Sequence, residues 1–199
     1  MLHTATQIIA KCNRPNVQGL YAQQFAVMAT DYKERQKTDF PLTLFTERAF
    51  EMRLNDESAL NTDGIPAAAC NLLAAHHLIL RRVSAADNGP TSPGSPNEAW
   101  VFRHDKVWDY FIAKAFSGDT ERQNQYMGDS RFRGTYLMLI QEEPLAAARD
   151  LEKRLSDYAA KTKDHSVSDD VRLLLRDREL HENAQSKIDD KRDKEKDVV

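Results

Sequence analysis

Residues 101–116, VFRHDKVWDYFIAKAF, are the stretch from which the fold is most readily inferred. The apolar and β-branched residues at its start predict a strand over residues 99–103. After a short polar link, two neighbouring rows of apolar residues recur at every fourth position. The rows are Val107, Phe111 and Ala115, and Trp108, Ile112 and Phe116. Together they form a wide apolar face, so the stretch predicts a strand that leads directly into a deeply packed helix.

Three helices and one further strand are predicted before this stretch. Apolar residues three and four positions apart place the helices at residues 16–36, 40–55 and 65–77. In the second of these helices the pattern directs Arg53 toward water. Residues 78–83 predict a strand, and the Gly- and Pro-rich residues 87–97 predict a mobile loop that joins the two strands into a hairpin. Three helices followed by a hairpin are the outline of a winged helix.

Beyond residue 116 the pattern is helical again. Helices are predicted at residues 129–140, 145–158 and from 168 onward. Residues 181–199 contain almost no apolar side chains, so this segment is either a frayed helix or a disordered tail. We therefore expect a mainly α protein with one β-hairpin. Its predicted parts are a winged-helix-like domain (1–117), a helical extension that forms a small bundle or hairpin (118–180), and a charged tail (181–199).

Composition narrows the classes of function. The net charge is −3, with acidic and basic residues interspersed, so no global field attracts the chain to nucleic acid or to an anionic membrane. The two cysteines, Cys12 and Cys70, form no Cys-x-x-Cys pair and fit a reducing cytoplasm. No stretch approaches the roughly 20 apolar residues needed to cross a bilayer. We expect a cytoplasmic protein outside the membrane.

The sequence contains no recognisable catalytic pattern, so we predict no catalytic residue and no metal site. No G-x-x-x-x-G-K-[ST] run is present to hold phosphates. The adjacent His76 and His77 point about 100° apart on a helix and make a poor metal pair. Cys70 lies among alanines, where a buried thiol stays protonated and inert. The carboxylates have the pattern of solvated helix faces.

One cluster of polar side chains stands out at the link between the last strand and the following helix. His104 opens the helix, and Arg103 and Lys106 flank it. A histidine, two cations and the free N–H groups of a helix start are suited to receiving an anion. The simpler alternative is that Arg103 and Lys106 are solvated while His104 caps the helix or packs.

A family resemblance adds to this interpretation. The run LLAAHHLIL followed, after the loop, by WVFRHDKVWDYFIA resembles the winged-helix lid of NACHT-type STAND signalling NTPases, which ends in Phe-x-His, an aromatic pair and Ala. The matching residues are Phe102, His104, Tyr110, Phe111 and Ala113. The similarity extends over residues 17–178. It implies that His104, with Arg103 beside it, senses the β-phosphate of ADP, while Phe102, Trp108, Tyr110 and Phe111 pack.

The resemblance also implies a function. The chain would be the regulatory lid and interaction segment of a nucleotide-switched signalling ATPase, with bacterial defence as a setting, and it would not be catalytic alone. It lacks the P-loop, so we expect no cofactor in this chain by itself. ADP or ATP with magnesium would bind when an NTPase core is supplied upstream in the same polypeptide or by a partner.

Two other functions stay open. A free-standing winged-helix nucleic-acid binder would place residues 65–77 in the major groove, but that helix contains no Arg or Lys, which disfavours nucleic acid as a partner. A helical adaptor would bind another protein through its C-terminal helices, with Arg131, Phe132 and Arg133 as candidate contacts. For Phe132 itself the pattern favours the core over a surface contact. Self-association would accompany an exposed apolar patch.

Overall fold

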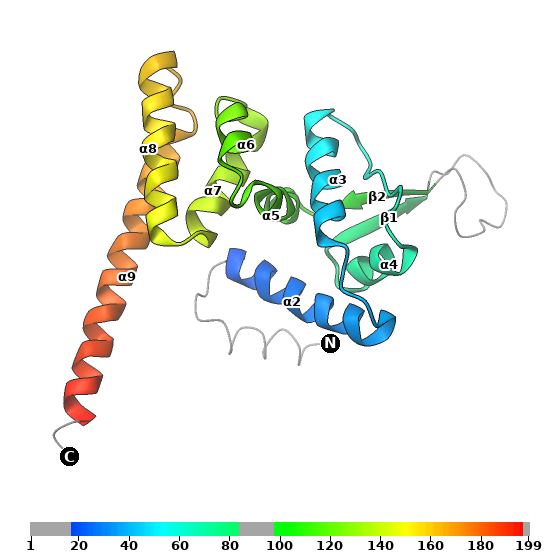
Figure 1. The fold of residues 1–199 in the computed structure, drawn as a ribbon, viewed down its shortest axis with the longest axis horizontal. Helices are drawn as coiled ribbons and strands as arrows, with labels where there is room; N and C mark the ends of the chain where they lie inside the picture. Colours follow the sequence, from blue (N-terminus) through cyan, green and yellow to red (C-terminus); the bar gives the residue numbers. More distant parts are fainter. Residues whose placement is uncertain (1–16, 84–97, 197–199) are drawn as a thin grey trace. The chain divides into compact units, whose positions relative to one another are not determined.

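The computed structural model describes residues 17–83 and 98–196, with side chains placed for residues 19–82 and 99–184. The chain divides into two compact units, residues 1–116 and 117–199. Figure 1 shows that the described residues are mainly helical and contain one two-stranded antiparallel sheet. This confirms the predicted fold class.

The first unit has the predicted order of helices followed by a hairpin. Its described elements are α2 (Val17–Gln36), α3 (Leu42–Leu54), α4 (Ala67–Ala75), β1 (Ile79–Val83), β2 (Glu98–Phe102) and α5 (Asp105–Phe116). Pro66 is the N-cap of α4, so this helix begins two residues later than predicted. The loop predicted at residues 87–97 lies outside the described residues.

The hairpin fixes the position at which α5 begins. Ile79 of β1 pairs with Phe102 at the end of β2, in an antiparallel register. A third segment adds to the outer side of β2, because the Leu60 N–H donates to the Trp100 carbonyl (2.7 Å). Strand β2 is therefore paired on both sides at Trp100, two residues before it ends and the chain turns into the helix.

Aromatic side chains from α2, α3 and α5 fill the core of the first unit. The Phe111 ring lies 4.7 Å from that of Phe45 and 5.5 Å from that of Phe25, in edge-to-face geometry. Such pairs contribute about 0.5–1.5 kcal/mol each beyond the area that they bury. Phe111, Ile112 and Phe116 are each 0% exposed, which confirms the predicted buried face of α5.

The second unit is a small helical bundle, as predicted, in which α7, α8 and α9 pack against one another. Its described elements are α6 (Thr120–Gln125), the 3₁₀ turn η1 (Ser130–Phe132), α7 (Arg133–Glu142), α8 (Leu145–Thr162) and α9 (Ser168–Lys196). The sequence pattern misses α6, a six-residue helix without apolar residues. It begins where the Asp119 carboxylate accepts from the Arg122 N–H (2.9 Å).

Helix α9 includes most of the segment predicted as a tail, since its backbone is helical to Lys196. Arg178 ties this helix to the end of α7. Its Nη1 donates to the carbonyls of Ile140 (2.5 Å) and Glu143 (2.7 Å), while its Nε bonds to Glu182 (2.8 Å). A cation that binds the last carbonyls of a helix also complements the helix dipole.

Gly128 lies where the chain after α6 passes the side chain of Tyr158. A Cβ atom at this position would lie 1.9 Å from the Tyr158 hydroxyl oxygen and 2.6 Å from Cζ. We expect Gly128→Ala to lower the free energy of unfolding by about 1–3 kcal/mol, because it overpacks this contact. Denaturant titration measures the loss. In a Tyr158→Ala background the same substitution should cost much less, and equal losses in both backgrounds would contradict the steric explanation.

Candidate functional site

Two residues, Arg103 and His104, connect β2 to α5, and both are held by their main chain. The Arg103 N–H donates to the Leu78 carbonyl (3.2 Å), which extends the hairpin by one bond. The His104 carbonyl accepts from the N–H groups of Val107 (3.0 Å) and Trp108 (3.2 Å), so it forms the first hydrogen bonds of the helix. The link therefore has little freedom to move relative to the hairpin or to α5.

Trp108, in the first turn of α5, joins this link to α3. Its ring stacks on Phe102, with 5.6 Å between centroids and 9° between planes. The indole N–H donates to the Ala49 carbonyl of α3 (2.7 Å). The Arg53 guanidinium lies over the ring, with Cζ 4.2 Å from the centroid, in the geometry of a cation–π contact. One side chain thus contacts a strand and a helix that are distant in sequence.

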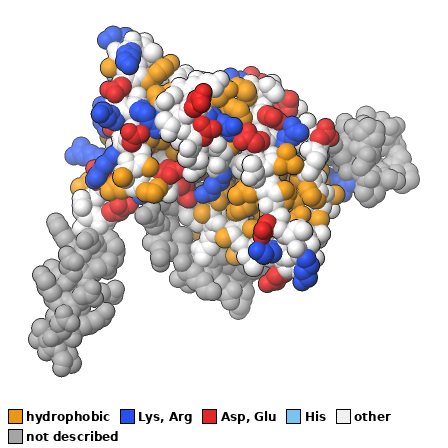
Figure 2. All heavy atoms as spheres, viewed as in Figure 1, with side chains coloured by type: hydrophobic (Ala, Val, Ile, Leu, Met, Phe, Trp, Pro, Cys, Tyr) orange, Lys and Arg blue, Asp and Glu red, His pale blue; other side chains and the backbone are white. Residues whose placement is uncertain are grey.

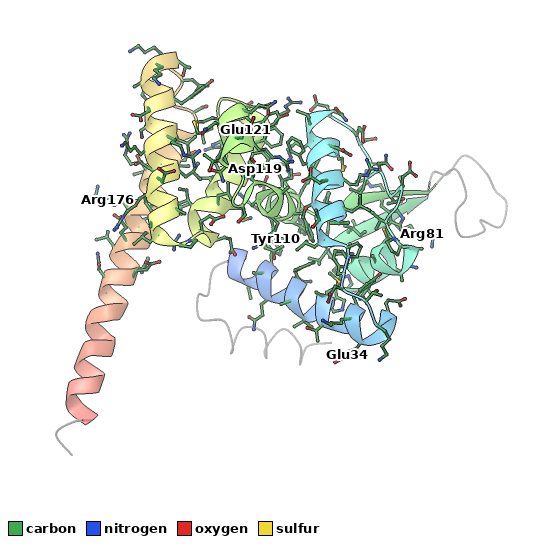
Figure 3. The ribbon with its side chains drawn as sticks, in the orientation of Figure 1. Glu34, Arg81, Tyr110, Asp119, Glu121 and Arg176 are labelled. Carbon is green, nitrogen blue, oxygen red and sulfur yellow. The ribbon has the colours of Figure 1, made fainter. Side chains whose placement is uncertain are left out.

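The four residues predicted to pack are all at least partly covered. Phe102 and Trp108 are half-buried and stack on each other. Tyr110 is 2% exposed and Phe111 is 0% exposed. Figure 3 shows Tyr110 on α5, and its ring lies 6.2 Å from that of Phe25 on α2. These side chains form a rigid support beneath the link at residues 103–104.

An ion pair between Arg53 and Asp109 is buried beside Trp108. The two residues are 8% and 5% exposed, and the Arg53 Nη1 donates to the Asp109 carboxylate. Burial raises the pKa of Asp109 above its usual range, while the positive charge of Arg53 acts in the opposite direction. The predictions that Arg53 faces water and that the carboxylates are solvated were wrong here, because α5 covers this side of α3.

Arg103 and His104 differ from the residues that support them, because both side chains are exposed. Within the described part of the chain neither side chain makes a hydrogen bond or an ion pair. His104 therefore caps α5 through its backbone carbonyl and does not pack. Lys106 and Asp105 in the first helical turn are exposed as well. An imidazole, two cations and one carboxylate thus surround the start of α5, an arrangement able to donate hydrogen bonds to an anion.

His76 and His77 have separate local environments. His77 adopts φ +60° and closes α4, with its own N–H and that of Leu78 bonded to carbonyls of the last helical turn. The His76 Nε2 lies 3.6 Å from a carboxylate oxygen of Asp31. Among the residues that the structure describes, no group of three or more His, Cys, Asp or Glu side chains is placed to hold a metal ion.

Cys70 is buried in α4, as predicted. It is 1% exposed, and burial raises the pKa of its thiol to about 11. The reactive form of cysteine is the thiolate, so a buried thiol with this pKa is a poor nucleophile at neutral pH.

The candidate interaction residues of the second unit have partners within that unit. Phe132 is 0% exposed, with its ring 5.3 Å from that of Tyr126, which agrees with the core position that the sequence favoured for this residue. The turn η1 directs this side chain inward. Arg131 bonds to Asp129 (2.7 Å) and lowers the pKa of that carboxyl, and Arg133 pairs with Asp170.

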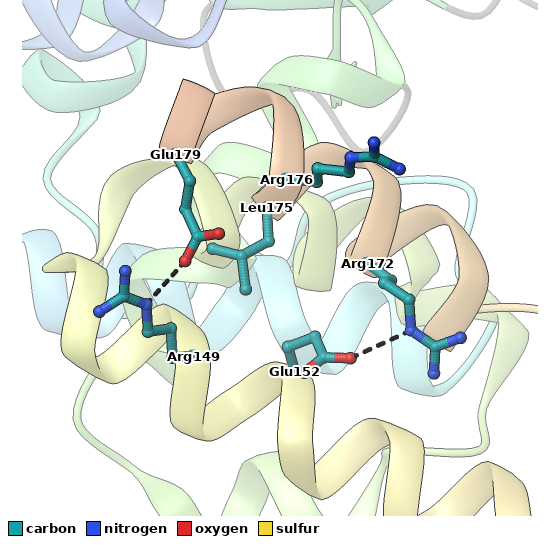
Figure 4. A pocket seen from close by; sticks show the side chains of 6 residues that line it. All are labelled: Arg149, Glu152, Arg172, Leu175, Arg176 and Glu179. Carbon is teal, nitrogen blue, oxygen red and sulfur yellow. Dashed lines mark hydrogen bonds and ion pairs between the residues drawn. The ribbon is translucent and has the colours of Figure 1, made fainter. Parts of the chain in front are cut away.

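A shallow depression of about 370 Å³ lies between α8 and α9 (Figure 4). It is lined by Arg149, Glu152, Arg172, Leu175, Arg176 and Glu179. Arg149 pairs with Glu179 (2.7 Å) and Arg172 with Glu152 (3.4 Å), so most of the charge is neutralised within the depression. Figure 2 likewise shows acidic and basic side chains interspersed over the visible face. The sequence pattern does not identify this site, because each pair joins different helices.

Comparisons of the chain with protein families, curated proteins and solved structures find no match. None of the described helices combines the length and the apolar character needed to span a membrane. The geometry at the start of α5 is therefore the main basis for a functional proposal.

The buried ion pair gives a prediction about stability. We expect Asp109→Leu to lower the free energy of unfolding by about 3–5 kcal/mol, because Arg53 has no neutral form and is left unpaired. Arg53→Met should cost less at pH 5 than at pH 8, because Asp109 with its raised pKa can bind a proton and become neutral. Denaturant titrations at both pH values measure these losses.

The double variant Arg53→Met/Asp109→Leu is the matched control. It replaces both charges with apolar groups of similar shape and should recover most of the stability that either single change removes. Additive losses in the double variant would show that the two charges act independently.

Cys70 gives a prediction about reactivity. In a Cys12→Ser background, which leaves Cys70 as the remaining thiol, we expect a thiol reagent at pH 8 to modify the folded protein far more slowly than the denatured protein. The reaction is followed by absorbance. Equal rates in the two states would show that Cys70 is accessible in the fold.

Proposed function

We propose that this chain is the regulatory lid of a nucleotide-switched signalling ATPase of the NACHT-type STAND class. In this role His104 contacts a phosphate of a nucleotide that a P-loop core holds, and Arg103 adds positive charge beside it. The single observation that carries the proposal is that both side chains are exposed and unpartnered within the described residues, on a link fixed by its main chain.

The packing beneath the link supports this role. A side chain that senses a phosphate must be presented at a defined position, because charge-assisted hydrogen bonds require short distances and good alignment. The stack of Phe102 on Trp108 and the bond from Trp108 to Ala49 supply that support. A lid influences a switch only through contacts that differ between its states. His104 would make its contact in the ADP-bound, closed state and lose it on opening.

In this proposal the chain itself is not catalytic, and the P-loop core holds most of the nucleotide. ADP or ATP with magnesium would bind to the P-loop core, in the same polypeptide or in a partner. One imidazole and one guanidinium would add affinity without forming a complete site. The chain alone is then expected to bind nucleotide weakly.

Nucleic-acid binding is the weaker alternative. The exposed residues of α4, the helix that would enter a groove, are Ala67, Asn71 and Ala75. None of them carries a positive charge to contact phosphate, and only Asn71 could read a base edge. The cations nearest in sequence, Arg81 and Arg82, lie on β1.

The His104 contact predicts a change in nucleotide retention. In the polypeptide or complex that joins this chain to a P-loop core, we expect His104→Ala to accelerate ADP release by about tenfold, the equivalent of one charge-assisted hydrogen bond. Basal signalling should increase, because the closed state is less favoured. Release of a fluorescent ADP analogue measures the rate.

His165→Ala is the matched control, because His165 is an exposed histidine of the second unit. It should leave ADP release unchanged. Equal ADP release from the His104→Ala and His165→Ala proteins would refute the proposed contact. The absence of a P-loop from both the natural polypeptide and its stable complexes would refute the proposed class.

A further inference from the structure

The outer face of α9 carries the two most exposed large apolar side chains of the described residues. Leu173 is 62% exposed and Leu180 is 60% exposed, compared with 40% for Val27 and 39% for Leu80 in the first unit. The two leucines are seven residues apart, so they lie on the same side of the helix, about 10 Å from each other along its axis. Val171 and Leu175 lie on the opposite side and are buried.

Two charged residues, Arg176 and Asp177, lie between these leucines. Arg176 and Asp177 are exposed, and in the described part of the chain neither makes an ion pair or a hydrogen bond. In Figure 4 no dashed line reaches Arg176, and Figure 3 shows this side chain projecting from α9. Adjacent residues of a helix do not face each other, so Arg176 and Asp177 do not satisfy one another.

The neighbouring charges of the same helix are paired within the second unit. Arg172 pairs with Glu152, Glu179 with Arg149, and Asp170 with Arg133. Arg178 bonds to Glu182 and to two carbonyls. Among the described residues of this surface, the run Leu173-x-x-Arg176-Asp177-x-x-Leu180 therefore lacks partners. Its four named residues are, in order, apolar, basic, acidic and apolar.

We propose that two copies of this chain associate through this run, with their α9 helices antiparallel about a two-fold axis between Arg176 and Asp177. In this arrangement Leu173 faces the partner's Leu180, and Arg176 faces the partner's Asp177. The same surface is used by both copies, as a two-fold interface requires. A parallel pair would instead set Arg176 against Arg176 and Asp177 against Asp177, which like-charge repulsion disfavours.

Helix α9 can pair on this side without losing its packing within the second unit, because Val171 and Leu175 are buried on the opposite side. Its 29 residues span about 43 Å, compared with about 27 Å for the 18 residues of α8 that pack on its other side. The contact is small, so the dimer belongs with weak, transient interfaces. The proposal does not depend on the nucleotide switch, because it uses only the second unit.

Analytical ultracentrifugation of the full chain over a range of concentrations tests the proposal. The unaltered chain should dimerise as its concentration rises, and Leu173→Glu/Leu180→Glu should stay monomeric. Val27→Glu is the matched control at an exposed apolar residue of the first unit and should not change the dissociation constant. Helix content from circular dichroism identifies any variant that fails to fold.

Charge exchange tests the antiparallel arrangement. Arg176→Asp and Asp177→Arg should each weaken self-association about tenfold, since each creates like charges across the axis. The double variant Arg176→Asp/Asp177→Arg should restore it, and an equimolar mixture of the two single variants should form a mixed dimer. A chain that is monomeric at all concentrations, a dimer that survives the leucine substitutions, or a double variant that stays weakened would overturn the proposal.

Discussion

The contacts of Trp108 are the constraint on which the first unit depends. This side chain stacks on Phe102 at the end of β2, donates to the Ala49 carbonyl of α3, and lies against the Arg53 guanidinium. It fixes the hairpin, α3 and α5 relative to one another. The position of Arg103 and His104 follows from it, because these two residues lie between the strand and the helix that Trp108 holds together. The exposed polar groups at the start of α5 are thus positioned by buried aromatic packing.

The sequence predicted the main elements because their signals are local. The two apolar rows of α5 repeat every fourth residue, and their burial against α2 and α3 agrees with that pattern. Helix α6 was missed because it has no apolar repeat and begins with a hydrogen bond from Arg122 to Asp119. Helix α4 begins later than predicted because Pro66 is its N-cap and not one of its helical residues. The spacing of apolar residues along a sequence says little about how a helix is capped or which distant elements it packs against.

The candidate site was predicted in part. The sequence identified Arg103 and His104 as a polar cluster beside an aromatic helix, and the structure places both side chains at the surface. It did not identify Arg53 and Asp109, because each residue alone reads as a solvated helix position. Only their approach across 56 residues turns two surface-like positions into a buried pair. Phe132 is a different case, because the sequence favoured the core for this aromatic residue and the structure buries it there.

The buried pair also constrains how this protein can diverge. A change at Arg53 or at Asp109 alone leaves a charge or a polar group without its partner inside the fold, whereas a joint change to two apolar residues keeps the packing. The two positions should therefore vary together in related chains. Such covariation between positions 53 and 109, combined with an aromatic residue at position 108, would identify distant relatives that overall sequence similarity no longer reveals.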